Sequence, residues 1–397
     1  MPFSDKQIRS LRADTPGTSH VLHFNNAGAA LPPQPVTKAQ MHHLQRESEI
    51  GGYEAAAEAS DSIQHTYDAI ARMLGGSPEE VALVENATRA WDMAFYGLPI
   101  ETGDRILTSR ASYASNYIAM LQVAERTGAT VEVVPATETG EIDAGVLREM
   151  MDERVAVIAL THIPTNGGLV NPAAEVGRVA DEWEVPFLLD ACQSAGQMPL
   201  DVSKLGCTML SATGRKYLRG PRGTGFLYVR DEWIQRITPP LLDLHAATWT
   251  GSDSYEIQPG ASRFETFEGH VAGKVGLGVA VDYALQLGLD RIFERLQSLG
   301  AMLRATLSSM DGVTVHDTGQ TRCGITTFST HGMEASDIQR HLRELDVNVS
   351  VSSPPSTLLD ATERNLPTLV RASVHYYNTT AEIDRFADHL STILSTA

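Results

Sequence analysis

Short apolar runs alternate with amphipathic stretches along the first two thirds of the chain. Several runs are apolar at consecutive positions, such as VAVIAL at 155–160 and VPFLL at 185–189. Strands that are buried on both faces show this pattern, and such strands belong to parallel sheets covered by helices. The strands that the pattern predicts are Glu80–Val84, Arg105–Thr108, Thr130–Val134, Val155–Leu160, Val185–Leu189, Thr208–Ser211 and Gly225–Val229.

Helical periodicity separates these strands and then dominates a second region. Asn116–Arg126 and Ala173–Trp183 are amphipathic, which together with the strands predicts a three-layer α/β sandwich. Val271–Leu287 and Asp290–Met310 are expected to form two long helices. Short elements follow them: strands at Val313–His316, Gly324–Phe328, Val347–Val351 and Val370–Val374, and helices at Ala335–Leu345 and Ala381–Leu394.

This change of pattern predicts how the chain is divided. The fold class is α/β, with a large three-layer domain around a mainly parallel sheet and a smaller α+β domain at the C-terminus. We expect an N-terminal arm at 1–35, the large domain at 36–289 and the small domain at 290–397. A chain of 397 residues is long enough for two or three such units.

Composition excludes several classes of function. The net charge of −18 disfavours a nucleic-acid or anionic-membrane binder, because the summed field repels phosphate. No apolar run approaches the roughly 20 residues that span a bilayer, and the first residues lack the apolar core of a secretory signal. Three cysteines without C-x-x-C spacing argue against a disulfide framework and a zinc site. We therefore expect a cytoplasmic protein without a metal.

One of the lysines lies where a reactive amine is expected. The chain has only five, and Lys6, Lys38, Lys204 and Lys274 are most simply surface charges. Lys216, in SATGRKYLRGPRGTG, lies just beyond a predicted strand. It therefore stands at the carboxyl edge of an α/β sheet, where ligands bind. A surface lysine in a glycine-rich turn is the alternative interpretation.

A carboxylate at the same edge strengthens the functional interpretation. Asp190 ends the apolar strand in VPFLLD, 26 residues before Lys216, which leaves room for one crossover and one strand. The two side chains would then lie on neighbouring strands. A lysine that forms an imine and an anion that holds a cationic ring nitrogen are what pyridoxal phosphate requires. An aspartate that caps a turn is the simpler alternative.

A phosphate site is also available. Glu85–Arg89 (ENATR) follows the strand EVALVE and opens a helical pattern, so free backbone N–H groups and the Thr88 hydroxyl would face an anion. The helix dipole contributes only about 0.3–1 kcal/mol per charge, so a cationic partner such as Arg215 would be needed as well.

Together these residues resemble a known family. From FNNAGAALPP (24–33) to RASVHYYNT (371–379), the chain is similar to the class V aminotransferase group of fold-type I pyridoxal phosphate enzymes. That group includes cysteine desulfurases, isopenicillin N epimerase-like proteins and hercynylcysteine sulfoxide lyases. The resemblance implies pyridoxal 5'-phosphate as cofactor and a homodimer that shares its active sites.

The resemblance gives cofactor roles to particular residues. Lys216 looks like the imine-forming lysine and Asp190 like the partner of the pyridine nitrogen. Gln193 resembles the residue that hydrogen-bonds the phenolic oxygen. Tyr113 looks like the aromatic that stacks on the ring, where relatives commonly have His.

Phosphate contacts follow from the same comparison. Ala87 and Thr88 match the phosphate-binding helix start. Thr213 and Arg215 resemble the contacts just before the lysine, although many relatives have His in place of Arg215. The resemblance further implies that Gly269 and His270 reach the phosphate of a partner subunit.

Substrate contacts are implied as well. Arg371 resembles the arginine that grips the substrate α-carboxylate, a task that suits a bidentate guanidinium. Either Thr165 or Asn166 falls where relatives place an asparagine that faces the substrate or cofactor. Tyr53 and His375 would line a pocket for the substrate side chain, although packing in the core or at a rim explains both equally simply.

One departure from the family bears on the reaction. Cysteine desulfurases carry a nucleophilic cysteine shortly before the carboxylate-binding arginine, whereas 347–371 contains Ser, Thr and Pro but no Cys. Cys192 and Cys207 are interpreted as packing thiols. We therefore expect abstraction of the Cα proton and β-elimination at a C–S bond, in the manner of a sulfoxide lyase.

Other reactions stay open at this point. A class V aminotransferase or an epimerase would share the same proton abstraction and differ only in where the proton returns. A non-enzymatic binding module would be expected to lack the lysine or the aspartate, and both are present. His42 and His43 are adjacent on a predicted helix and cannot share one face, which disfavours a metal site there.

Overall fold

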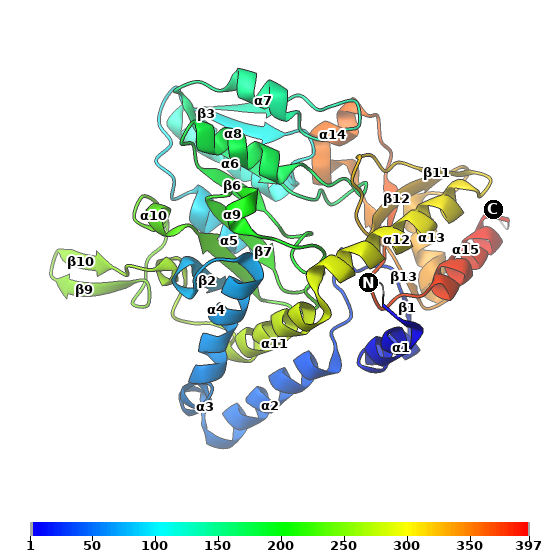
Figure 1. The fold of residues 1–397 in the computed structure, drawn as a ribbon, viewed down its shortest axis with the longest axis horizontal. Coiled ribbons are helices and arrows are strands. Elements are labelled where there is room, and N and C mark those ends of the chain that lie inside the picture. The colour runs from blue at the N-terminus through cyan, green and yellow to red at the C-terminus, as the bar shows by residue number, and fades with distance from the viewer. Residues whose placement is uncertain (1–2, 396–397) are drawn as a thin grey trace.

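The computed structural model describes residues 3–395 and shows a layered α/β architecture (Figure 1). In this part of the chain the largest sheet has seven strands, in the order β2-β8-β7-β6-β5-β3-β4. β8 pairs antiparallel with both β2 and β7, and every other pair in this sheet is parallel. The sheet is therefore mainly parallel, as predicted. Its strands are β2 (Val81–Val84), β3 (Arg105–Ser109), β4 (Thr130–Val134), β5 (Val155–Thr161), β6 (Phe187–Asp190), β7 (Met209–Thr213) and β8 (Gly225–Val229).

Helices cover both faces of this sheet. Consecutive residues of β5 alternate between two apolar clusters: Ile158 packs into one and Val157 into the other. This explains why the sequence of β5 is apolar at every position. One cluster includes α5 (Ala87–Phe95) and α6 (Ala114–Thr127); the other includes α4 (Ser60–Leu74), α7 (Ala144–Met150), α8 (Ala173–Glu182), α9 (Val202–Leu205) and α11 (Val271–Leu287).

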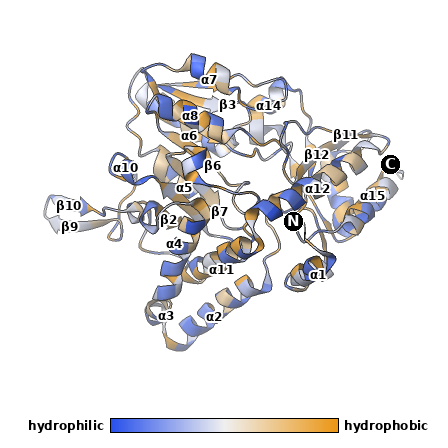
Figure 2. Cartoon of the chain, viewed as in Figure 1, coloured by the Kyte–Doolittle hydropathy of each residue, from blue (hydrophilic) through white to orange (hydrophobic). Residues whose placement is uncertain are grey.

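Hydropathy follows these layers. In Figure 2 the strands around β6 and β7 are coloured hydrophobic, whereas helices such as α2 (Gln34–Ile50) and α12 (Leu289–Ser308) show both colours. The strands of the large sheet other than β4 are buried almost throughout their length. The hydrophobic effect therefore fixes the centre of the sheet, and the helices turn their polar faces to water.

The N-terminal segment crosses to the C-terminal part of the molecule. It contains α1 (Asp5–Ala13) and the short strand β1 (Leu22–His23), and α2 and α3 (Gly52–Glu58) follow. β1 pairs in parallel with β13 (Val347–Asn348), which is more than 300 residues away along the chain. Residues 24–30 are thereby held between the two halves of the molecule, beside the candidate site.

The C-terminal part has a four-stranded antiparallel sheet in the order β11-β12-β15-β14. Gly288, with φ of +84°, separates α11 from α12 at the point where the sequence predicts the boundary between domains. That division stays a prediction. The elements are β11 (Val313–Val315), β12 (Ile325–Thr330), α13 (Ala335–Glu344), β14 (Ser350–Ser352), α14 (Leu358–Glu363), β15 (Leu369–Ser373) and α15 (Thr380–Ser395).

Two features differ from the sequence-based expectations. The single strand expected at Val347–Val351 is two strands, because β13 pairs with β1 whereas β14 pairs with β15. The hairpin of β9 (Ala247–Gly251) and β10 (Ser254–Ile257) was not predicted, and Figure 1 shows it projecting from the body after α10 (Asp231–Ile234). The 3-10 turns are Pro16–Ser19, Pro78–Glu80, Ala261–Phe264 and Pro354–Thr357.

Candidate active site

A cavity of about 440 Å³ opens at the carboxyl edge of the large sheet. Its floor comes from the last residues of three adjacent strands, Thr161 of β5, Asp190 of β6 and Thr213 of β7. Parallel pairing brings these residues together, and Thr161 and Asp190 are direct partners in register. We call this the inner cavity; it is lined by Asn86, Ala87, Thr88, Tyr113, Asn116, Thr161, Ile163, Thr165, Asp190, Cys192, Gln193, Thr213, Arg215 and Lys216.

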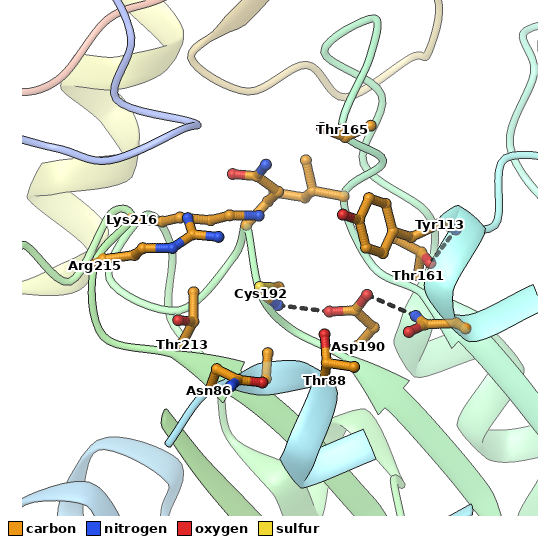
Figure 3. Close-up of a pocket in the computed structure, with 14 residues that line it drawn as sticks. Asn86, Thr88, Tyr113, Thr161, Thr165, Asp190, Cys192, Thr213, Arg215 and Lys216 are labelled. Carbon is orange, nitrogen blue, oxygen red and sulfur yellow. Dashed lines mark hydrogen bonds between the residues drawn. The ribbon is translucent and has the colours of Figure 1, made fainter. Parts of the chain in front are cut away.

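Asp190 is a buried carboxylate on this floor. Its Oδ2 accepts a hydrogen bond from Asn116 Nδ2 at 2.8 Å and its Oδ1 accepts one from the Cys192 N–H at 2.9 Å (Figure 3). Burial raises the pKa of Asp190, while the Cys192 N–H, Lys216 and Asn116 act in the opposite direction. The carboxylate is oriented and partly compensated, and a cation beside it would complete the compensation.

Lys216 approaches the cavity from the opposite side (Figure 3). Burial lowers its pKa most; Arg215 and Arg371 lower it further, whereas Cys192 and Asp190 raise it. Among the five lysines, all of which the structure describes, Lys216 alone lines this cavity. Lys204 instead pairs with Asp201, Lys274 lies 3.4 Å from Glu265, and Lys6 and Lys38 are exposed.

The start of α5 supplies backbone donors. Asn86 caps this helix and accepts a hydrogen bond from the Arg89 N–H at 2.9 Å. Ala87 and Thr88 occupy the first turn and line the cavity, where N–H groups have no acceptor within the helix. The dipole of the helix and the nearby Arg215 favour an anion at this end of the cavity.

Thr213 and Arg215 lie next to this helix start. The Thr213 hydroxyl donates to the Thr224 carbonyl at 3.2 Å. The Arg215 guanidinium donates to the carbonyl of Gly28, and the Arg215 carbonyl accepts from the Ala30 N–H at 2.9 Å. Arg215 therefore joins the N-terminal segment to the wall of the cavity.

Gln193 and Tyr113 complete the lining. Gln193 is buried, and its Nε2 donates to the Ala27 carbonyl at 3.1 Å. Its Oε1 is buried without a hydrogen-bond partner among residues 3–395. Tyr113 precedes α6, its N–H donates to Thr161 Oγ1 at 3.3 Å, and its ring is 38% exposed, so a flat ligand has access to it.

A second cavity of about 350 Å³ adjoins the first and shares Tyr113, Thr165, Arg215 and Lys216 with it. We call it the outer cavity. It also contains Arg371, whose guanidinium donates to Thr165 Oγ1 at 2.5 Å and to the Thr165 carbonyl at 3.2 Å. Arg371 Nε is buried and has no partner in the described chain. The full lining is Asn25, Ala27, Gly28, Ala29, Tyr113, Thr165, Arg215, Lys216, Arg222 and Arg371.

The structure distinguishes Thr165 from Asn166. Thr165 lines both cavities. Asn166 lines neither: its Nδ2 donates to Thr357 Oγ1 at 3.0 Å and its Oδ1 accepts from the Ser352 hydroxyl. Asn166 thus ties the loop after β14 to the large sheet, while Thr165 faces the space that a ligand would occupy.

Two expected pocket residues lie elsewhere. Tyr53, on α3, is 77% exposed and lines neither cavity. His375 is fully buried: its ring stacks on Tyr377, its Nδ1 accepts from the Tyr376 N–H, and its Nε2 lies 3.1 Å from the Tyr217 carbonyl. In this chain one side chain faces solvent and the other belongs to the core, as the packing alternative described, and a contact of either with substrate stays a prediction.

Gly269 and His270 also lie outside both cavities. They line a separate small pocket with Gly223 and Thr224. A contact with a partner subunit stays a prediction for these two residues.

Several lining residues were not predicted. Asn116 carries no sequence signal beyond its helical position, whereas Asn86 lies in the predicted phosphate segment Glu85–Arg89 but was not singled out there. Cys192 was interpreted as a packing thiol, yet it lines the inner cavity within hydrogen-bonding reach of Lys216, where burial raises the pKa of the thiol. Cys207 and Cys323 do lie in the core, and burial raises the pKa of each to about 12. Asn25 lies within the FNNAGA motif, but nothing marked it as a cavity residue.

Other kinds of site are not formed by the described residues. Between residues 3 and 395, no three His, Cys, Asp or Glu side chains gather where they could hold a metal ion. Within the same range, no helix is both long enough and apolar enough to cross a bilayer.

The match to known proteins covers almost the entire chain. The family model described as aminotransferase class-V matches residues 21–386. The chain belongs to the class-V aminotransferase family. Enzymes of this family depend on pyridoxal 5'-phosphate.

Curated members of the family resemble the chain from end to end. A protein of Methanothermobacter thermautotrophicus, named "Probable cysteine desulfurase", is 29% identical over 98% of both chains. A protein of the same name from Xylella fastidiosa is 30% identical over 97% of this chain and 95% of its own.

Solved structures share the fold. The apo cysteine desulfurase of Thermococcus onnurineus NA1 has a TM-score of 0.91, 24% identity and 98% coverage of both chains. The cystine C-S lyase C-DES, solved with cysteine persulfide, has a TM-score of 0.84 and 23% identity and covers 95% of this chain and 99% of its own. At these identities the likeness establishes the class-V fold.

The inner cavity fits the cofactor of this family. A buried carboxylate, Asp190, lies on the floor where a cationic ring nitrogen would compensate it, and Gln193 has an unpaired buried oxygen nearby. Lys216 provides an amine and the start of α5 provides donors for a phosphate. The lining therefore offers a carboxylate for a ring nitrogen, an amine for an aldehyde and backbone donors for a phosphate, which are the groups that a phosphorylated pyridine aldehyde would use.

Proposed function

We propose that this class-V enzyme is a C–S lyase that removes a sulfur leaving group from Cβ of a cysteine-derived amino acid. The overall reaction consumes one water and releases a thiol or sulfenic acid, pyruvate and ammonium. The observation that carries the choice of reaction is the segment 347–371. It has no cysteine, and Ser352 and Thr357 hold it against Asn166.

The segment 347–371 is the reason for proposing a C–S lyase in place of a cysteine desulfurase. In cysteine desulfurases, the corresponding loop carries the cysteine that takes up sulfur. Here no thiol on this loop is available to accept it, so sulfur has to leave attached to the departing group. The names of the curated relatives support chemistry at the C–S bond of cysteine, and one of the solved neighbours is named as a cystine C-S lyase.

Residues of the inner cavity would hold the cofactor. When bound, pyridoxal phosphate supplies an electron sink for the pair left at Cα. Asp190 would keep the ring nitrogen protonated, and Tyr113 would cover one ring face. The first turn of α5, with Thr88 and Arg215, would bind the phosphate dianion.

Lys216 would move the proton. Burial lowers its pKa, which raises the fraction of neutral amine available as a base at Cα. Arg371 would grip the α-carboxylate, since its Nε is unpaired and the Thr165 contacts fix the rest of the guanidinium. In this proposal the Cα–H bond would lie between Arg371 and Lys216, and the fact that both line the same cavity supports it.

A product assay tests this function. The holoenzyme is offered cysteine S-conjugates and their sulfoxides without any 2-oxo acid, and pyruvate and thiol are measured. Equimolar pyruvate and thiol support the lyase. A strict requirement for a 2-oxo acid identifies an aminotransferase, and loss of α-deuterium with recovery of intact substrate identifies an epimerase. Alanine as the organic product identifies a desulfurase.

A homodimer is part of the proposal. Gly269 and His270, outside the cavities of their own chain, are proposed to contact the cofactor phosphate of a partner subunit. The exposed Trp249 and Tyr255 of the β9–β10 hairpin are available to contact a second copy. Sedimentation velocity should give a dimer, and a monomeric holoenzyme with full activity would contradict it. We also propose a cytoplasmic location, and this proposal rests only on the number and spacing of the cysteines in the sequence.

A further inference from the structure

The outer cavity has an unusual balance of charge. Four of its lining residues are cationic, namely Arg215, Lys216, Arg222 and Arg371, and no Asp or Glu of the described chain lines it. The chain as a whole carries a net charge of −18. A cation-rich recess in an acidic protein concentrates positive potential where anionic ligands enter.

The proposed reaction uses three of these cations. Lys216 serves the cofactor and the Cα proton, Arg215 lies beside the expected phosphate, and Arg371 takes the α-carboxylate. The proposed reaction gives Arg222 no role. It is exposed, and the structure of residues 3–395 gives it no hydrogen bond and no ion pair.

The loop that carries Arg222 is fixed. The Thr224 hydroxyl donates to the Pro221 carbonyl at 2.7 Å, and the Gly214 N–H donates to the Thr224 carbonyl at 2.9 Å. Gly223 has a φ of +75°, a conformation that suits glycine, and so completes the turn. The Cα of Arg222 is therefore held at the cavity, which reduces the entropy lost when its side chain binds a ligand.

A neutral amide side chain also belongs to this cavity. Asn25 lines the outer cavity, and its Oδ1 is buried and unbonded in the described chain. The segment that carries it is anchored: the Asn26 side chain donates to the Ser373 carbonyl at 2.7 Å, and the Ala27 N–H donates to Ser373 Oγ at 2.9 Å. The unpaired Oδ1 is an acceptor and is itself buried, so a contact with an anion would have to come from the Asn25 Nδ2 amide, which donates no hydrogen bond in the described chain.

We propose that Arg222, with the Nδ2 amide of Asn25 as a second donor, forms a subsite for a second anionic group, a carboxylate on the leaving-group side of the substrate. The inference rests on the proposed lyase function and narrows its substrate class to cysteine conjugates with an acidic S-substituent. Arg371 and Arg222 then bind the two carboxylates at opposite ends of one substrate, and the C–S bond lies between them.

Two isosteric probes test the subsite. S-carboxymethylcysteine and S-carbamoylmethylcysteine differ by a carboxylate in place of an amide. We expect the holoenzyme to prefer the charged probe by at least about tenfold in kcat/KM, as a charge-assisted contact predicts. Arg222→Gln should reduce that preference to about unity and Arg222→Lys should retain part of it. Arg178→Gln, an exposed arginine on α8, is the matched control and should keep the full preference.

Binding separates this inference from the proposed function. In the Lys216→Ala background, calorimetry gives dissociation constants for both probes without turnover. A preference for the charged probe that Arg222→Gln removes supports the subsite, even if the intact enzyme releases no pyruvate and the lyase reaction is wrong. Equal affinities, or a preference that Arg222→Gln leaves intact, overturn the subsite, even if pyruvate is released from both probes.

Discussion

The inner and outer cavities meet at Lys216, yet they are built in different ways. The floor of the inner cavity comes from the ends of three neighbouring strands, and its charged groups include one buried carboxylate, Asp190. The outer cavity combines the N-terminal segment, the loop after β7 and strand β15, and its charged groups are all cationic. The floor of the inner cavity thus forms from neighbouring strands of one sheet. The outer cavity forms only when segments that are far apart in the sequence pack together.

This difference separates two tasks. The inner cavity presents groups that a phosphorylated pyridine ring needs, and any reaction of the family would use them. The outer cavity presents cations, and in the proposed function these would face the part of the substrate that extends from Cα. Changes in the inner cavity should therefore affect every substrate, whereas changes in the outer cavity should affect some substrates more than others.

The largest effect is expected at the residue that both cavities share. Lys216→Ala should reduce turnover by about 10⁴-fold, because the base at Cα is lost. Borohydride reduction of the native holoenzyme, followed by peptide mass analysis, should find the cofactor on residue 216. Lys204→Ala, which changes an exposed lysine, is the control and should keep its activity. A labelled lysine elsewhere would contradict the assignment.

A smaller loss is expected on the floor of the inner cavity. Asp190→Asn keeps the shape but removes the charge beside the ring nitrogen, and turnover should fall by roughly 10²–10³-fold. The loss should be similar for charged and neutral substrates. A loss confined to one substrate class would break the division of tasks between the cavities.

The Asp190→Asn variant should also differ from wild type in the pH dependence of its stability, measured on cofactor-free protein. Burial raises the pKa of Asp190, so the folded state holds this proton more tightly than the unfolded state does. The resulting stability is present at low pH and is lost as pH rises from the ordinary pKa through the raised one. Asp190→Asn cannot titrate. Urea unfolding should therefore show the variant gaining stability relative to wild type as pH increases from about 4 to 7.

Arg371→Ala should act mainly on KM, which we expect to rise roughly 100-fold for every amino acid because a buried charge-assisted contact is lost. Arg371→Lys should restore part of the affinity, since it keeps the charge without the bidentate geometry. Steady-state kinetics on one reactive substrate provides the measurement. An unchanged KM would remove Arg371 from the carboxylate role.

The smallest effect is expected outside both cavities. Asn166→Ala removes the contacts to Ser352 and Thr357 and should lower the free energy of unfolding by about 1–3 kcal/mol. Hydrogen exchange should increase in 350–357. The exposed Thr362→Ala change, on α14, serves as a comparison. Unchanged exchange in that loop would show that Asn166 does not hold it.

The fold was largely predictable because its strongest signals are local. Continuous apolar runs located the strands of the large sheet to within one or two residues, and the long helix Val271–Leu287 matches the structure. The β9–β10 hairpin was not predicted from the sequence because its strands are short and mostly exposed. They therefore lack a buried face that would produce a hydrophobic pattern. The split between β13 and β14 depends on two different pairing partners, which no local pattern encodes.

The site was predictable to the same extent. Asp190 and Lys216 lie beside strand ends, so strand prediction alone brought them to one edge. Tyr53 and His375 were chosen for their side-chain type and their nearness to motifs, and neither property shows which way a side chain points. Arg222 lies in the glycine-rich stretch after Lys216 but was not singled out, because the outer cavity forms only when that loop packs beside residues 25–29 and strand β15.

Position 28 has a consequence for how this enzyme could diversify. A Cβ on Gly28 would come within 2.4 Å of Asn25 Oδ1, and the carbonyl of the same residue receives the Arg215 guanidinium. A single added methyl group would therefore displace the Asn25 amide from its place in the outer cavity while leaving the chain at Lys216 unchanged. Substitutions at this one small residue of the cavity wall would therefore change the shape and polarity of the outer cavity.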